Sequence, residues 1–142
     1  MIPAVRDSKP GHPSAFRLHP SGEAVRRSSF RLHPWTLLVL YIIYQEDDPG
    51  SAALRAAHRE AHFAYLEKHR DSLVLGGALL AEDGKTRTGS VLIINVPDLA
   101  AAEAFSRDEP FRKAGLFRSV KISRMRRGQW NPAAAPKSAE GH

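Results

Sequence analysis

The segment Thr36–Tyr44 restricts the fold of this chain more than any other stretch of its sequence. It contains no charged residue, glycine or proline, and it is rich in branched and aromatic side chains, which is typical of a β-strand. Because successive side chains of a strand point to opposite faces, both faces of this strand are apolar. One face carries Leu38, Leu40, Ile42 and Tyr44, and the other carries Leu37, Val39, Tyr41 and Ile43. Such a strand belongs in the middle of a sheet that is covered on both sides.

The rest of the chain supplies the other elements of that sheet. Residues 52–70 are rich in helix-forming side chains, and Ser51 is placed to cap the first turn. A second helix is predicted over residues 99–107 with Asp98 as its N-cap, and further strands over residues 72–80, 89–96 and 116–125. A turn at residues 82–85 predicts an antiparallel hairpin. The order β-α-β-β-α-β predicts an α+β fold of the ferredoxin-like type, in which the first and third strands are central.

This topology has a consequence for assembly. Two helices cover only one face of a four-stranded sheet, so the other face would expose an apolar patch of several hundred Å² in a monomer. We therefore expect two copies to pack sheet against sheet in a symmetric homodimer, which makes a dimeric α+β barrel.

Composition excludes several classes of protein. The chain has 142 residues, is 42% hydrophobic and 25% charged, and contains no cysteine, so disulfides, thiolate metal sites and cysteine nucleophiles are excluded. No apolar run approaches the roughly 20 residues that a membrane-spanning helix needs. We expect a cytoplasmic protein with one folded domain and no membrane partner.

The positive charge is concentrated outside the expected domain. Of the net charge of +6, residues 1–34 carry six basic and two acidic residues, residues 35–130 carry fourteen and twelve, and residues 131–142 balance. Residues 1–34, with five prolines, are predicted to be a flexible basic arm, residues 35–130 the domain, and residues 131–142 a disordered tail. The arm repeats Phe-Arg-Leu-His-Pro at positions 16–20 and 30–34. It is interpreted as a duplicated leader or the product of an overcalled start codon, as an arm that binds a partner or an anionic surface, or as a transit peptide.

Histidines gather on one face of the first predicted helix. At 100° per residue the inward face collects two groups, apolar residues and histidines: Leu54, His58, Ala61, His62, Tyr65, Leu66 and His69. His58 and His62 are four residues apart, which is close enough to share a metal ion. The string His-Arg-Glu-Ala-His places its glutamate differently from the zinc-protease motif, however, so no metal site is predicted.

An ordered set of short motifs adds a family resemblance. The chain reads Arg59-Glu-Ala-His62 in the first helix, Gly76-Gly77 in the second strand and Glu109-Pro110-Phe111 before Ala-Gly-Leu-Phe at positions 114–117. Over residues 37–127 it resembles the YCII (YciI-like) family. The resemblance implies a dimeric α+β barrel similar to muconolactone isomerase, and lyase or isomerase chemistry on oxidised aromatic compounds without a cofactor. It also implies an active site of His62 and an acid before the Pro-Phe pair, which is Glu109 here, with Asp108 one position earlier as the alternative.

The chemistry of these residue types supports that site. A neutral imidazole exchanges a proton near neutral pH, and a carboxylate on its other nitrogen fixes the tautomer and stabilises the imidazolium. Arg59 is a candidate for binding a carboxylate or phenolate oxygen of a small-molecule ligand, and Tyr41 or Tyr44 for donating a hydrogen bond. Gly76 and Gly77, where the second strand is predicted to kink, would let a ligand come close. The competing interpretation makes His62 a structural residue and pairs Arg59 with Glu60 or Glu67 on the surface.

The last predicted strand is basic. Residues 107–127 hold eight Lys or Arg against two acids, with Val120 and Ile122 predicted inward and Lys121 and Ser123 outward. We interpret these charges as a solvated sheet edge, with an anion-binding rim as the alternative. Nucleic acid is not a predicted partner, because no aromatic residues alternate with the charges.

Three functions stay open from the sequence. The first is a cofactor-independent enzyme in which His62 and a carboxylate move a proton on a small anionic or phenolic metabolite. The second is a dimeric binding or sensing module that uses the same pocket without turnover. The third is an interaction protein that works through its basic N-terminal arm.

Overall fold

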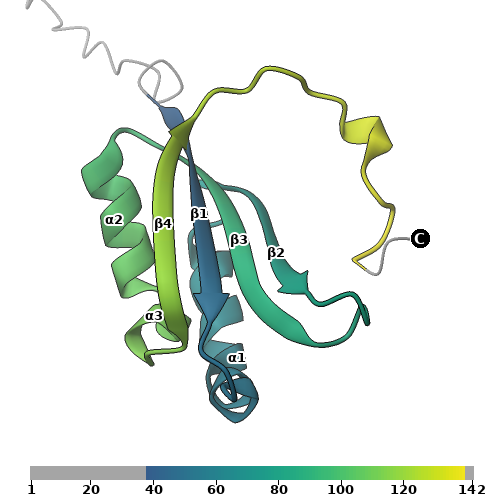
Figure 1. Cartoon of the computed structure of the whole chain (residues 1–142). Coiled ribbons are helices and arrows are strands. Elements are labelled where there is room, and N and C mark those ends of the chain that lie inside the picture. The colour runs from purple at the N-terminus through teal and green to yellow at the C-terminus, as the bar shows by residue number, and fades with distance from the viewer. Residues whose placement is uncertain (1–37, 140–142) are drawn as a thin grey trace, which may run out of the picture. The chain divides into compact units, whose positions relative to one another are not determined.

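The structure of the protein is a computed structural model that describes residues 38–139. The predictions for the basic arm and its repeated pentapeptide therefore lie outside the described residues. The described elements are strand β1 (Val39–Asp47), helix α1 (Ala52–Lys68), strands β2 (Leu73–Leu80) and β3 (Arg87–Val96), helices α2 (Leu99–Asp108) and α3 (Pro110–Lys113), and strand β4 (Phe117–Met125) (Figure 1). A 3₁₀ turn, Pro132–Ala134, lies in the predicted tail.

The strands form one antiparallel sheet in the order β2-β3-β1-β4. The first and third strands are therefore the central pair, which confirms the α+β, ferredoxin-like prediction. Their register places Tyr41 opposite Ile94 and Ile43 opposite Leu92. The helices lie on one side of the sheet (Figure 1).

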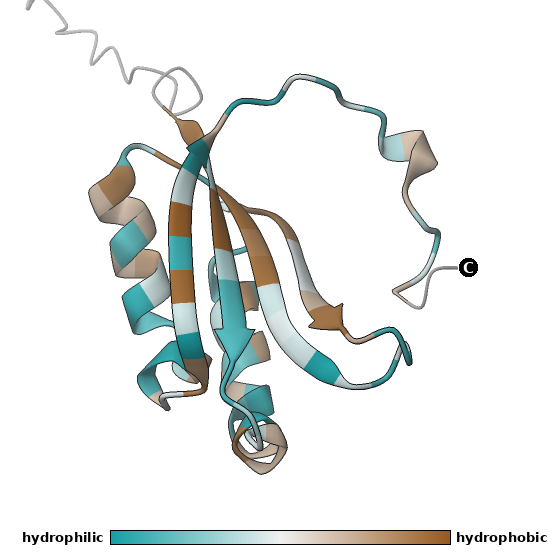
Figure 2. Ribbon diagram, viewed as in Figure 1, coloured by the Kyte–Doolittle hydropathy of each residue, from teal (hydrophilic) through white to brown (hydrophobic). Residues whose placement is uncertain are grey.

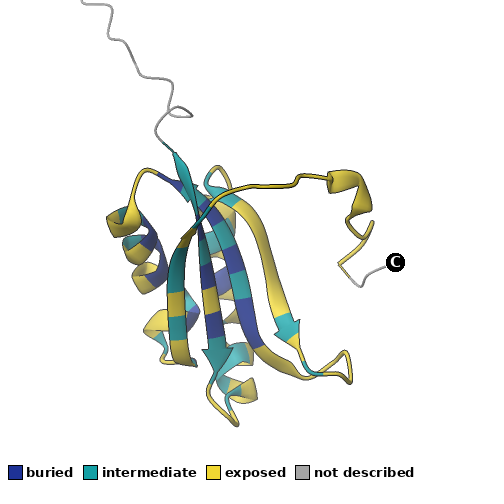
Figure 3. Cartoon of the chain, turned by 45° about the horizontal axis from the view of Figure 1, so that its top comes forward, coloured by how far each residue is buried: buried dark blue, intermediate teal, exposed yellow. Residues whose placement is uncertain are grey.

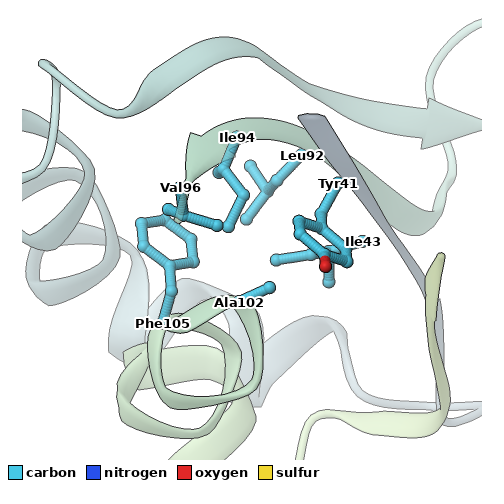
Figure 4. Packing of buried hydrophobic residues seen from close by; sticks show 7 residues of the cluster. All are labelled: Tyr41, Ile43, Leu92, Ile94, Val96, Ala102 and Phe105. Carbon is cyan, nitrogen blue, oxygen red and sulfur yellow. The ribbon is translucent and has the colours of Figure 1, made fainter. Parts of the chain in front are cut away.

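The hydrophobic core lies between that side of the sheet and α2. Alternate residues of β1 and β3 point into it, and two residues of α2 close it from the other side (Figure 4). Its buried members are Tyr41, Ile43, Leu92, Ile94, Val96, Ala102 and Phe105. In Figure 3 the same alternation appears as buried residues that recur along β1 and β3.

The opposite face of the sheet is also rich in apolar residues. Ile42 pairs with Ile93, and Ile93 pairs with Leu75 on the edge strand, so these side chains share the face that no helix of the described chain covers (Figure 2). Leu75 is 60% exposed and Tyr44 is 40% exposed. The sequence predicted this second apolar face of the central strands correctly.

Local predictions at the element ends met mixed outcomes. The Asp98 carboxylate accepts the Ala101 N–H at 2.8 Å, so this cap is confirmed, whereas Ser51 precedes α1 without any side-chain capping bond. β1 runs through Gln45 to Asp47, beyond the predicted end at Tyr44. The expected kink at Gly76-Gly77 is wrong, because both residues pair regularly with β3 and the irregularities of β2 lie nearer its two ends.

A close backbone approach requires glycine at the start of β3. A Cβ at Gly89 would lie 2.1 Å from the Gln45 carbonyl oxygen, which belongs to the neighbouring central strand and cannot move aside alone. Gly89→Ala is expected to lower the free energy of unfolding by roughly 1–3 kcal/mol in urea titrations, through this clash. Gly77→Ala is the control, because a Cβ there meets nothing within 4 Å. Equal stability of the two variants would contradict this prediction.

Candidate functional site

His62 is the one described α1 residue that is buried, and it faces a buried carboxylate. Its Nδ1 lies 2.5 Å from Oε1 of Glu109, which has no exposed surface. Asp108, the other acid that the sequence offered, has a side chain 61% exposed and lies near Arg107 instead. The structure therefore pairs His62 with Glu109.

The junction of α2 and α3 aims the Glu109 side chain. α2 ends at Asp108, Glu109 has an extended backbone, and Pro110 starts α3 at the position where a missing N–H costs nothing. As the N-cap of α3, Glu109 accepts the Phe111 N–H on Oε1 and the Arg112 N–H on Oε2, each at 3.1 Å. The carboxylate is thus held by the backbone before any ligand binds.

This arrangement fixes the imidazole tautomer. An ionised carboxylate only accepts hydrogen bonds. Nδ1 of His62 therefore carries the ring proton and donates a hydrogen bond to Glu109. Nε2 then presents its lone pair away from Glu109. No hydrogen bond to Nε2 occurs within residues 38–139, and Nε2 is not among the buried polar atoms that lack a partner. The His62 side chain is 10% exposed, so the ring edge is within reach of a small molecule.

A second set of contacts fixes the plane of the ring. The imidazole stacks on Phe111 with centroids 4.1 Å apart and an interplanar angle of 16°. The Arg55 guanidinium lies 4.8 Å from the centre of the same Phe111 ring. Arg55 in turn forms two hydrogen bonds with Asp47 at the end of β1.

The sequence analysis did not assign Asp47, Arg55 or Phe111 to the site. One signal was available: Arg55 precedes His62 by seven residues, which is about two helical turns, so both side chains share a face of α1. The partnership of Asp47 with Arg55 depends on how β1 meets α1, and local patterns do not show it.

The other predicted site residues lie elsewhere. Arg59 is exposed, and its guanidinium stacks 5.5 Å over the Phe63 ring. Tyr41 is buried in the core, whereas Tyr44 lies on the opposite face of the sheet.

The two glycines are on the edge strand β2. A Cβ at Gly76 would meet the Leu92 side chain, and one at Gly77 would meet open space. No hydrogen bond connects either glycine, Arg59 or either tyrosine with His62 in the described residues.

Metal ligands and membrane spans were sought within the same part of the chain. Residues 38–139 contain no group of three His, Asp or Glu side chains arranged to hold a metal ion. No helix formed by these residues is long and apolar enough to cross a membrane.

Two surface hollows do not include the His62–Glu109 pair. One, of about 440 Å³, lies between α2, α3 and β4 and contains Ser106, Arg112 and Ile122. The other, of about 540 Å³, is lined by Val39, Leu40 and residues 124–127.

Tyr65 anchors α1 beside the pair. Its hydroxyl donates to the Phe105 carbonyl oxygen at 2.9 Å. Burial first, and then the negative charges of Asp108 and Glu109, raise the pKa of Tyr65 to about 12. The Tyr65 phenol therefore stays neutral at pH values at which a free tyrosine is already ionised.

The raised pKa of Tyr65 predicts a pH dependence of stability. Below pH 10 the hydrogen bond should make the wild type more stable than Tyr65→Phe by roughly 1 kcal/mol. As pH rises from 10 to about 12, the unfolded chain loses the phenolic proton while the folded chain retains it, so the stability advantage shrinks. Urea unfolding of both proteins from pH 8 to 12 measures this difference. A difference that is constant across this range would contradict the prediction.

Comparison with known proteins gives a consistent picture. Residues 39–126 match the YCII-related domain family. Protein YciI of Escherichia coli is 32% identical over 91 residues, which are 59% of this chain and 93% of the relative. A Haemophilus influenzae protein is 30% identical over 87 residues, 56% of this chain and 89% of that one.

One solved structure is similar in both fold and sequence. It is the 5-chloro-2-hydroxyhydroquinone dehydrochlorinase of Burkholderia phenoliruptrix in complex with 2,5-dihydroxybenzoquinone. The match has a TM-score of 0.58 and 35% identity, and it covers 63% of this chain and 95% of the other.

Proposed function

Because the chain belongs to the YCII-related domain family, we propose that it is a small enzyme that moves a proton on a hydroxylated aromatic or quinone-like compound. His62 is the acid-base group and Glu109 is its partner. The observation that carries this proposal is the buried hydrogen bond of 2.5 Å between Nδ1 of His62 and Glu109, which leaves Nε2 free. The reaction class is that of a lyase or an isomerase.

Each contact of the pair has a chemical role. Nε2 accepts a proton from the ligand, and the Glu109 carboxylate stabilises the imidazolium that results. The backbone N–H groups of Phe111 and Arg112 keep that carboxylate from turning away. The stacked Phe111 ring limits rotation of the imidazole, so the free nitrogen keeps one direction.

The proton transfer accounts for both reaction classes. When Nε2 removes a proton from a ring hydroxyl, the electron pair of that O–H bond forms a carbonyl and pushes electron density into the ring. In an isomerase, the imidazolium returns the proton to a ring carbon. In a lyase, the imidazolium returns that proton to the ring carbon that bears the leaving group. Nε2 then takes the proton of a second ring hydroxyl, whose O–H electron pair forms another carbonyl and, through a ring C=C bond, expels the leaving group with its bonding electron pair; the imidazolium later releases its proton to solvent. Neither course needs an oxidant.

The choice of ligand class rests on the structural neighbour. That protein acts on a chlorinated hydroquinone and its structure holds a dihydroxybenzoquinone. Both compounds are small, planar and acidic at ring oxygens. Arg59 lies one helical turn before His62, and on leaving Phe63 its guanidinium would supply a charge for such an oxygen.

We propose further that a second copy covers the open face of the sheet. Leu75 and Tyr44 are 60% and 40% exposed there, beside the paired Ile42 and Ile93. Contiguous apolar surface of this kind is typical of an interface between subunits. The homodimer would bury this face on the side of the sheet opposite to the helices, so both His62–Glu109 pairs would stay open to ligand.

The proposed activity is tested directly with wild-type protein. 5-Chloro-2-hydroxyhydroquinone is supplied as substrate, chloride release is followed, and 2,5-dihydroxybenzoquinone is added as a competitor. The proposal predicts turnover above the buffer rate and inhibition by the quinone. A parallel assay follows consumption of unchlorinated hydroxyhydroquinone for the isomerase course. Binding of the quinone without turnover of either compound would contradict the enzyme proposal and support a binding module.

A further inference from the structure

We propose that Asp47 and Arg55 are positioning residues for His62, and that they act through the ring of Phe111. Their importance for catalysis rests on the proposed function, whereas their control of the imidazole does not. Together, the side chains of Asp47, Arg55, Phe111 and His62 connect the end of β1, two turns of α1 and the start of α3.

Two hydrogen bonds hold the Arg55 guanidinium against the Asp47 carboxylate. Nε of Arg55 donates to Oδ2 of Asp47 at 2.9 Å, and Nη2 donates to Oδ1 at 2.5 Å. The side chains are only 12% and 8% exposed. Two parallel hydrogen bonds fix the plane of a guanidinium as well as its position, which a single bond would not do.

Phe111 transmits that position to His62. Its ring is 1% exposed, contacts the Arg55 guanidinium at 4.8 Å from the ring centre, and stacks on the imidazole at 4.1 Å. Arg55 and His62 are seven residues apart, a rise of roughly 10.5 Å along α1, so the intervening ring connects two groups that are far apart on their helix.

The same residue also holds the carboxylate. The Phe111 N–H donates to Oε1 of Glu109, which is the oxygen that faces Nδ1 of His62. A shift of Phe111 would therefore move the stacking partner of the imidazole and its hydrogen-bond partner together. This is why we assign control of His62 to the contacts that hold Phe111.

Stability alone does not account for the Asp47–Arg55 pair. Burying two charges costs desolvation energy that their attraction often only offsets, and apolar side chains of similar volume can serve as well. Unlike apolar side chains, the pair gives the Arg55 guanidinium a defined orientation over the Phe111 ring. That orientation matters most to the group stacked on the same ring.

The pair also places a cation and an anion beside the Phe111 ring on which His62 stacks. With both partners present, the carboxylate of Asp47 offsets the guanidinium of Arg55. The remaining charged or titratable groups on the elements around the imidazole form no hydrogen bond or ion pair with it, apart from Glu109. They include His58, Arg59, Glu60 and Tyr65 on α1, Asp108 at the end of α2, Arg112 and Lys113 on α3, and Glu46 on β1, which pairs with Arg118.

The test is ligand-free NMR of the imidazole nitrogens in the full chain, with Asp47→Asn, Arg55→Met and the double variant. Asp47→Asn leaves an uncompensated cation, so the titration midpoint of His62 should fall; Arg55→Met should raise it, each by about 0.5–1 pH unit. The double variant should return close to the wild-type midpoint. Arg70→Met is the control, because Arg70 pairs with Glu67 on the exposed surface.

Opposite shifts of the two single variants separate the removal of one charge from a general loss of structure, which would shift both midpoints in the same direction. If a single variant fails to fold, the charge-balanced double variant still reports whether the His62–Phe111 ring contacts weaken, as the proposal predicts. Midpoints and ring contacts equal to wild type in the folded variants would overturn the proposal. Shifts of the same sign in both single variants would also overturn it. Because this NMR experiment uses no ligand, its result does not depend on whether the protein turns over a substrate.

Discussion

Replacing His62 by glutamine is expected to lower turnover of a hydroxylated aromatic substrate by roughly 10²–10⁴-fold, the usual contribution of a general base. Glutamine keeps a donor for the Glu109 carboxylate and a similar volume, but it cannot take up a proton. Because His62 is buried against Phe111 and Glu109, the imidazole is already in place before substrate arrives. The loss should appear in kcat, with little change in affinity for 2,5-dihydroxybenzoquinone.

Two variants complete this experiment. Glu109→Gln should also lower kcat, because the amide can present an N–H to Nδ1 and so disturb the tautomer that the carboxylate fixes. Asp108→Asn changes the neighbouring acid, whose side chain is 61% exposed, and should leave turnover within about twofold of wild type. A His62→Gln protein with wild-type kcat would refute the assignment of the general base.

Placing a charge on the open face of the sheet is expected to separate the two subunits of the proposed homodimer. Leu75→Lys puts an ammonium group into the proposed interface, where it loses water without gaining a partner. A cost of roughly 2–4 kcal/mol corresponds to a dissociation constant about 30- to 900-fold weaker. Sedimentation velocity across a concentration series should show a wild-type dimer and a monomeric variant at the same concentration.

Phe63→Lys is the matched control for this experiment. Phe63 is 55% exposed, close to the 60% of Leu75, but it lies on α1 and not on the sheet. This variant should keep the wild-type dimer. A wild-type protein that stays monomeric at tens of micromolar, or equal dissociation by both variants, would refute the proposed interface.

Much of the fold was predictable because its signals are local. Alternation of apolar residues identified the central strands, and Asp98 marked the start of α2 through its own capping bond. The extension of β1 was not predictable in this way. Gln45 is buried with its amide donating to Ser90 on β3 at 3.0 Å, and Asp47 pairs with Arg55 on α1. Polar residues at a strand end look like a turn until their tertiary partners are known.

The candidate site was also predictable only where its signals are local. The helical period placed His62 on the inner face of α1, but it also placed Ala61 there, and Ala61 is exposed. The sequence left Asp108 and Glu109 as alternatives, since a shift of one residue at a helix junction turns a side chain by about 100° around the helix axis. The cap geometry at the start of α3 decides between them. Arg59 and Arg55 lie one turn apart, and only the position of β1 shows which of them joins the stack on Phe111.

The most direct test of the His62–Glu109 site is a titration of the wild-type protein with 2,5-dihydroxybenzoquinone, observed at the side-chain nitrogens of His62 by NMR. If the pair is the ligand site, the Nε2 resonance should shift with ligand concentration while the proton stays on Nδ1. If the ligand binds and shifts only residues of the hollow between α2 and β4, such as Ser106 and Ile122, with both His62 nitrogens unchanged, the site is elsewhere and the proposed chemistry is wrong.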